Sequence, residues 1–146
     1  MPPVVRTLPI VFAFSLLACG GSDPGGGPRS RVKHFTGCEV PSGAVRVHDH
    51  ITGDDASYVA WVKLVVPKDR IDALVTSCGL EREALVQGYP TLAAPEERLP
   101  WWNPPEPDAM LGGELREDGR RVELQVLERD TDFAFYARSE SPAPAP

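Results

Sequence analysis

The 146-residue sequence has few of the residues on which enzymes and metalloproteins depend, with three Cys, three His and two Met. It contains no Cys-x-x-Cys pair, no Gly-x-Ser-x-Gly segment and no glycine-rich phosphate loop after a predicted strand. Zinc sites of the usual spacing, serine hydrolases of that type and phosphate-binding loops therefore find no support. Basic residues are also scarce, since residues 38–139 hold 11 Lys and Arg against 19 Asp and Glu, a net charge of −8. That charge repels nucleic acid, which we exclude as a partner.

Long apolar runs are missing as well. The longest, residues 8–18, has eleven residues, whereas a helix that crosses a membrane needs about 20. Its length and its position behind the single charge of Arg6 are typical of the apolar part of a secretory signal. We therefore expect residues 1–18 to direct export.

This apolar run ends in Leu16-Leu17-Ala18-Cys19, which resembles the lipobox of bacterial lipoproteins. In that family the chain is cut before the cysteine, whose thiol and new amino group are then acylated. The resemblance implies that residues 1–18 are a signal peptide and that Cys19 carries the lipid that binds the protein to the membrane. Gly20 rather than Asp after the cysteine implies the outer membrane of the cell envelope. The alternative is an unmodified Cys19 in an ordinary signal peptide.

Proline and glycine, 16 and 13 residues, are concentrated outside the expected folded part. Residues 19–37 are rich in both and predict the lipidated cysteine followed by a flexible tether. Its basic residues, among them Arg29 and Arg31, either touch anionic lipid or belong to a solvated spacer. Residues 140–146 predict a disordered Pro/Ala tail. One globular domain, residues 38–139, remains between them.

Two cysteines remain for this domain once Cys19 is assigned to the lipid. Export places Cys38 and Cys78 in an oxidising compartment, so we predict a disulfide between them. A bridge over this length of chain stabilises a fold by about 4 kcal/mol in the chain-entropy model.

Hydrophobic periodicity predicts an α+β domain, in which a single antiparallel sheet of about five strands carries one main helix. A stripe of apolar residues predicts this helix in residues 68–78, with Gly79 as its cap. Alternation in the first strand places Val45, Val47 and Asp49 on one side. The expected strands are residues 44–51, 58–66, 110–116, 121–127 and 133–138.

His48 and His50 lie on the same side of the first predicted strand, close enough to share a metal ion. Asp54 and Asp55 in the following turn would add oxygen ligands. The spacing fixes no third ligand, however, and the other interpretation is a pair of polar residues on a solvated strand face. A metal-binding module is thus the alternative function, and the preferred prediction includes no cofactor.

Trp101 and Trp102 lie in a Pro/Trp-rich crossing loop that contains six prolines between residues 90 and 107. Two adjacent Trp side chains are costly to expose. We expect them either to close the open side of the core or to form an aromatic platform for a glycan, a peptide or another envelope protein.

The order of features resembles that of small uncharacterised bacterial envelope lipoproteins. The resemblance is carried by Pro41-Ser42-Gly43-Ala44, by Trp102-Asn103-Pro104 and by a terminal hairpin near Tyr136. It implies a class and no activity. The prediction is a non-catalytic, lipid-anchored binding module whose partner is another envelope protein; a small hydrolase would require a carboxylate pair in a cleft.

Overall fold

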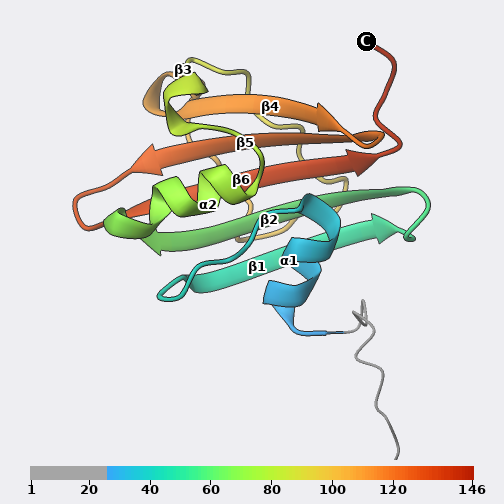
Figure 1. The fold of residues 1–146 in the computed structure, drawn as a ribbon, viewed down its shortest axis with the longest axis horizontal. Coiled ribbons are helices and arrows are strands. Elements are labelled where there is room, and N and C mark those ends of the chain that lie inside the picture. Colours follow the sequence, from blue (N-terminus) through green and yellow to red (C-terminus); the bar gives the residue numbers. More distant parts are fainter. Residues whose placement is uncertain (1–25) are drawn as a thin grey trace, which may run out of the picture.

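The computed structural model describes residues 26–146, which are built around one antiparallel sheet of six strands (Figure 1). The strands follow the spatial order β1-β2-β6-β5-β4-β3. The α+β class and the single antiparallel sheet are confirmed, but the expected five strands omit the two-residue edge strand β3. The strands are Val45–Gly53 (β1), Tyr58–Pro67 (β2), Val86–Gln87 (β3), Leu111–Glu117 (β4), Arg120–Glu128 (β5) and Asp132–Ser141 (β6).

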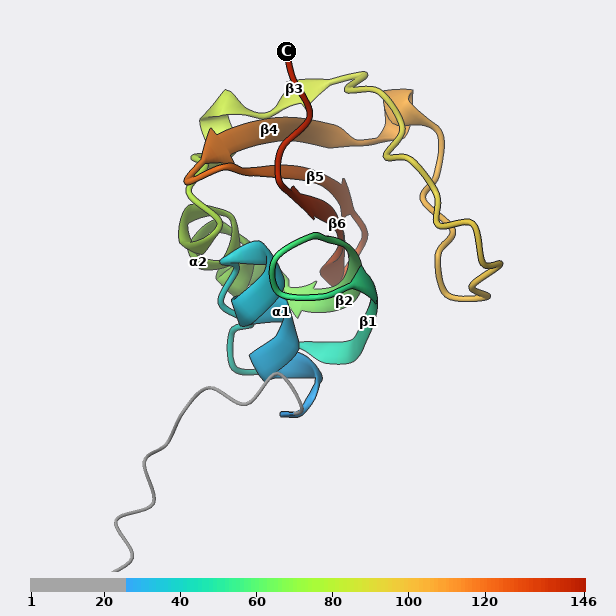
Figure 2. The same ribbon diagram turned by 90° about the vertical axis from the view of Figure 1, so that its right-hand side faces the viewer.

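Two short helices cover one face of this sheet. Helix α1 spans Pro28–Thr36 and helix α2 spans Ile71–Ser77, and both lie in front of the strands in Figure 1. Figure 2 shows the sheet edge-on, with the helices on one side and the loop between β3 and β4 on the other. Three single 3₁₀ turns complete the elements: Lys68–Arg70 (η1), Arg82–Ala84 (η2) and Pro107–Ala109 (η3).

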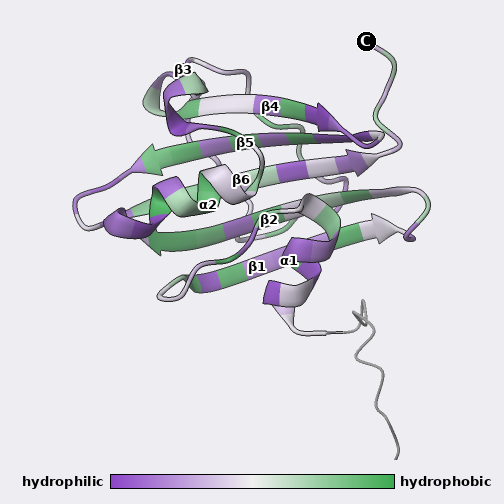
Figure 3. Cartoon of the chain, viewed as in Figure 1, coloured by the Kyte–Doolittle hydropathy of each residue, from purple (hydrophilic) through white to green (hydrophobic). Residues whose placement is uncertain are grey.

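The core lies between the helices and the central strands. Strand β2 is buried along most of its length, as its unbroken β-branched and aromatic run predicts. Hydrophobic residues dominate β2 in Figure 3, whereas the ends of β4, β5 and β6 nearest the C-terminus are hydrophilic. The helix-side core contains Val62, Leu64, Val66, Leu124, Val126, Phe135 and Ala137 from the strands and Ile71, Leu74 and Val75 from α2.

Helix α1 corrects the predicted tether. Residues 28–36 are helical and part of the fold, with Val32 and Phe35 only 1% and 6% exposed. The carbonyl oxygen of Phe35 accepts hydrogen bonds from the hydroxyls of Tyr58 and Ser139, each at 2.8 Å. The domain thus begins at the start of α1 and not at Cys38.

The basic residues of α1 bind the domain itself. Arg31 forms a bidentate ion pair with Asp49 of β1 at 2.6 and 2.9 Å, and the Asp49 side chain is 6% exposed. Arg29 donates to the carbonyl oxygen of Ala44 at 2.9 Å. These contacts hold α1 against the edge strand and explain why this segment is ordered.

The first strand is irregular, which corrects one detail of its predicted faces. The register between β1 and β2 shifts between Val45 and His48, and Arg46 adopts a positive φ of 52°. This β-bulge turns Val45 away from the helix-side core, so that it is 54% exposed, whereas Val47 packs against that core.

The C-terminal residues correct the predicted disordered tail. Strand β6 continues to Ser141, beyond the expected boundary at residue 139. The Ala143 amide donates to the carbonyl oxygen of Gly119 at 2.7 Å, and Arg116 donates to that of Pro144 at 2.8 Å. Two backbone positions of the tail are therefore bound to the β4–β5 hairpin.

The predicted disulfide is confirmed. Cys38 and Cys78 are bonded, with their Cα atoms 4.2 Å apart. The bridge joins the segment after α1 to the end of α2, where Gly79 adopts φ 93° as the predicted cap.

The predicted signal peptide and Cys19 lie outside the described residues. Within residues 26–146, neither helix has the length and apolar character needed to cross a membrane.

Because Phe35 anchors α1, its truncation tests whether the helix belongs to the folding unit. We expect Phe35→Ala to lower the free energy of unfolding by about 3 kcal/mol, the lower end for a buried aromatic residue. Urea denaturation of residues 20–146, without the proposed signal peptide and lipidated cysteine, measures this loss of free energy. Ser30→Ala, on the exposed side of the same helix, is the matched control and should change it by less than about 0.5 kcal/mol. Equal effects of the two variants would contradict a structural role for α1.

Candidate functional site

The second face of the sheet is divided by the loop of residues 88–109. This loop crosses one half of the face, as the right-hand side of Figure 2 shows, and forms a second small core there. The other half stays uncovered and is the candidate site. The small core consists of Leu92, Met110, Ala134 and Tyr136, with Tyr89, Trp102 and Leu127 packed against it.

Polar contacts fix the loop to the strands below it. The Trp61 indole nitrogen donates to the carbonyl oxygen of Ala93 at 2.8 Å, and the Gln125 amide donates to that of Tyr89 at 3.0 Å. Gln125 itself is fully buried under the loop. Further along, Asn103 accepts hydrogen bonds from Lys63 at 2.6 Å and from the Tyr136 hydroxyl. The covering of this half-face is therefore specific and not only apolar.

Strand register arranges the uncovered half in two cross-strand rows, because side chains directly opposite each other in neighbouring strands share a face. We call these ten residues, together with Trp101, the open face. The first row contains His50, Trp61, Arg138, Glu123 and Glu114, and the second contains Thr52, Val59, Glu140, Arg121 and Arg116.

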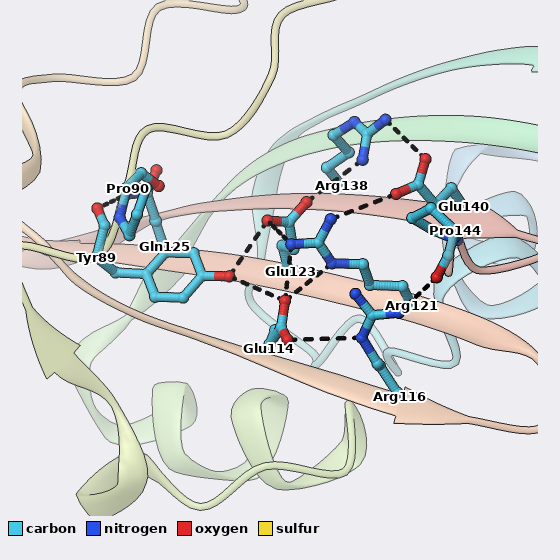
Figure 4. A network of polar contacts seen from close by, with 10 residues as sticks. All are labelled: Tyr89, Pro90, Glu114, Arg116, Arg121, Glu123, Gln125, Arg138, Glu140 and Pro144. Carbon is cyan, nitrogen blue, oxygen red and sulfur yellow. Dashed lines mark hydrogen bonds and ion pairs between the residues drawn. The ribbon is translucent and has the colours of Figure 1, made fainter. Parts of the chain in front are cut away.

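Arginine and glutamate alternate along β4, β5 and β6 and form one network (Figure 4). Arg121 lies within 2.7 Å of Glu114 and 2.9 Å of Glu123, two carboxylates that oppose each other directly in β4 and β5. Arg138 contacts Glu123 at 3.3 Å and Glu140 at 2.9 Å. Like charges placed directly opposite each other are unfavourable, so the two glutamates need the neighbouring arginines to neutralise them.

The network favours the ionised form of Glu114 and Glu140. A hydrogen bond from Arg121 is the main cause of the lowered pKa of Glu114, and one from Arg138 has the same effect on the pKa of Glu140. Burial, with the nearby charges of Glu123 and Glu114, raises the pKa of Tyr89 to about 12. A general acid needs a carboxyl group whose pKa is raised toward neutrality, whereas the pKa values of Glu114 and Glu140 are lowered.

A groove of about 500 Å³ opens where the loop leaves the sheet. Its floor is formed by Trp61 and Arg138, and the centroid of the Trp61 ring lies 6.0 Å from the Arg138 guanidinium carbon. The loop forms the opposite wall. The complete lining is His50, Thr52, Val59, Trp61, Ala94, Glu96, Glu97 and Arg138.

The two histidines proposed as metal ligands are engaged with aromatic rings. The His48 ring stacks on Trp101, with centroids 5.4 Å apart and planes 11° from parallel. His50 lies 5.8 Å from the Trp61 ring, and its Nε2 atom is 3.7 Å from Glu97. Within residues 26–146, no three His, Cys, Asp or Glu side chains are grouped so that they could share a metal ion.

The two aspartates proposed to complete that metal site serve other roles. Asp54 accepts hydrogen bonds from the backbone amides of Ala56 and Ser57 and stabilises the β1–β2 turn. Asp55 lies 2.9 Å from the Nε2 atom of His34 in α1. The structure thus does not bring either of them to His48 or His50.

The adjacent tryptophans have different environments: Trp102 meets the expectation of core closure, whereas an aromatic platform at Trp101 stays a prediction. Trp102 packs edge-on against Tyr136, 5.7 Å between centroids, and closes the small core. Trp101 is half-buried and rests on His48 of the edge strand. The first tryptophan therefore borders the open face, whereas the second belongs to its covering.

Sequence reasoning missed the residues that organise this surface. Alternation in β5 correctly placed Glu123 and Gln125 on the face opposite the main core. Alternation does not show how far these side chains are buried: Glu123 is only 9% exposed and Gln125 is fully buried. One signal was available in the sequence: Arg138 and Glu140 are two residues apart in the last strand, so they share a face there, as Arg121 and Glu123 do in β5.

The lowered pKa values of Glu114 and Glu140 predict acid lability of this surface. A carboxyl with a lowered folded pKa contributes stability above its unfolded pKa of about 4.3, and this contribution is lost as the pH falls through the folded value. We expect the free energy of unfolding to decrease from about pH 5 downward, and less steeply in Glu114→Gln than in the wild type. Urea denaturation between pH 6 and pH 3 measures both slopes. Glu81→Gln, at an exposed site away from the network, should keep the wild-type slope.

No family model matches the sequence, and neither a curated protein nor a solved structure is significantly similar to it. A function is therefore proposed from the chemistry of the open face.

Proposed function

We propose that the protein is a non-catalytic binding module of a bacterial envelope, anchored through lipid on Cys19 and binding a protein partner through the open face. The observation that carries this proposal is a surface of aromatic and charged side chains that is already fixed in place before any partner binds. The proline-rich loop holds one side of it, and the Arg–Glu network holds the other. Pre-organisation of this kind reduces the entropy that binding costs.

The composition of the open face favours recognition over reaction. Trp and Arg are the residue types most enriched among those that dominate protein interfaces. The carboxylates of the network are paired with arginines at 2.7–3.3 Å, so they are poorly placed to exchange protons with a substrate. Trp101, half-buried against His48, gives the rim of the surface an aromatic side chain of fixed orientation.

The anchor rests on the lipobox resemblance of Leu16-Leu17-Ala18-Cys19. Helix α1 begins at Pro28, so only residues 20–27 separate it from the proposed lipid. Eight residues span at most about 29 Å. A partner must therefore meet the open face close to the membrane surface.

Replacing the proposed acylation site tests the anchor. Cys19→Ser should abolish acylation and move the protein from the membrane fraction to the soluble fraction, because the acyl chains supply the membrane affinity. Mass spectrometry of the N-terminal peptide, with fractionation of the cells, measures both. A double variant, Cys38→Ser with Cys78→Ser, is the control and should stay acylated. A wild-type chain without acyl groups would contradict the anchor.

Truncation of the aromatic rim tests the binding surface. We expect Trp101→Ala to weaken binding of the cognate envelope protein at least tenfold, about the effect of losing one dominant interface residue. Crosslinking in native membranes identifies the partner, and calorimetry with the two purified proteins measures the affinity. Val86→Ala, at a 55% exposed site on the opposite edge strand, should bind as the wild type does. Unchanged affinity in Trp101→Ala would remove this rim from the proposed surface.

A further inference from the structure

The groove of the open face has an apolar interior and a charged rim. Val59, Trp61 and Ala94 provide carbon surface, and Thr52 provides a hydroxyl group. Trp61 is only 6% exposed, so it offers an edge of its ring rather than a broad platform. A volume of about 500 Å³ lies in the range of sites for small ligands or for single side chains with their backbone.

The charges around this groove do not cancel. Arg138 on the floor is offset by Glu123 and Glu140, which it contacts at 3.3 and 2.9 Å. Glu96 and Glu97 on the loop wall are both exposed. The His50 ring lies 3.7 Å from Glu97, whereas among residues 26–146 no Lys, Arg or His lies within ion-pair distance of Glu96. Arg98, the next residue in the chain, forms no ion pair with either carboxylate, and the two glutamates outnumber it. The rim is thus negative, in a domain that is itself strongly acidic.

A second hollow lies next to the groove. It has a volume of about 430 Å³ and shares Thr52 and Val59 with the groove as lining residues. Tyr58, Glu140 and Pro142 line its far side. A single small amine would occupy only one of these adjacent hollows, whereas a length of polypeptide would reach both.

We propose that the groove binds a basic side chain, Lys or Arg, of the partner protein, with its alkyl stem against Val59 and Trp61 and its charge beside Glu96 and Glu97. This inference rests on the proposed binding function and names the chemistry of the partner. The adjoining hollow accommodates the backbone that carries this side chain.

Titration with short peptides tests the proposal on the soluble chain, residues 20–146. The probes are the blocked pentapeptide Gly-Gly-Lys-Gly-Gly, its Arg analogue and its acetyl-lysine form, which keeps the stem but lacks the charge. We expect the two basic peptides to shift the NMR signal of the Trp61 indole N–H in a saturable manner. The acetyl-lysine peptide should bind at least tenfold more weakly. Trp61→Phe assigns the signal among the three tryptophans.

A matched pair of double variants isolates the acidic rim. Glu96→Gln with Glu97→Gln should weaken binding of the lysine peptide at least tenfold. Glu81→Gln with Glu83→Gln removes the same charge from two exposed acids outside the groove and should leave binding within twofold of the wild type. Equal weakening by both double variants would overturn the proposal, since it would show attraction by net charge alone.

Other results of these titrations would contradict the proposed binding of a basic side chain. Equal binding of the acetyl-lysine peptide would show an apolar site and overturn the cationic specificity. Butylamine that binds as tightly as the peptide would assign the groove to a free amine and overturn the partner-protein assignment. Absence of any Trp61 shift would refute the groove site alone if Trp101→Ala still weakens the cognate partner. If Trp101→Ala has no effect either, the proposed function fails as well.

Discussion

The need to cover both faces of the central strands determines the rest of this structure. Strands β2 and β6 are buried along most of their length, so each side of the sheet requires a layer above it. Helices α1 and α2 provide that layer on one side. On the other side no α-helix of residues 26–146 covers the sheet, and the proline-rich loop takes this role with Leu92 and Trp102. Because a loop of this length covers only half of the face, the remaining half has to be stable in contact with water.

The Arg–Glu network is the solution on that remaining half. Buried charge is unfavourable unless it is paired, and Glu123 at 9% exposure lies between Arg121 and Arg138. The alternation of Arg and Glu along β4, β5 and β6 fixes the register of these three strands, because a shift by one residue would place these charges in the helix-side core. The network therefore stabilises one arrangement of the sheet and also gives the open face its rigidity. Glu96 and Glu97 come from the loop and not from a strand, and they do not belong to this network of paired charges.

Most of the sheet could be predicted from local pattern. The alternation in β5, the unbroken apolar run of β2 and the Asp118-Gly119 turn each depend on nearby residues, and the structure agrees with them. Helix α1 could not be recognised by composition, because glycine and proline around it indicated a tether. Its local signals were nevertheless present, with Pro28 at the first helical position and Gly37, at φ 78°, directly after its end. Its real stabilisation comes from Asp49 and Tyr58, which are distant in sequence.

The candidate site depends on such distant contacts to a greater degree. Spacing alone put His48 and His50 on one strand face and suggested a shared metal. In the fold each ring instead meets a tryptophan, Trp101 from the crossing loop and Trp61 from the neighbouring strand. No pattern within β1 contains this information, since it arises only when the loop folds back across the sheet. The same folding creates the groove, because it brings the acidic loop residues over Trp61. A surface formed in this way depends on the loop, so the prolines that stiffen the loop also maintain the shape of the site.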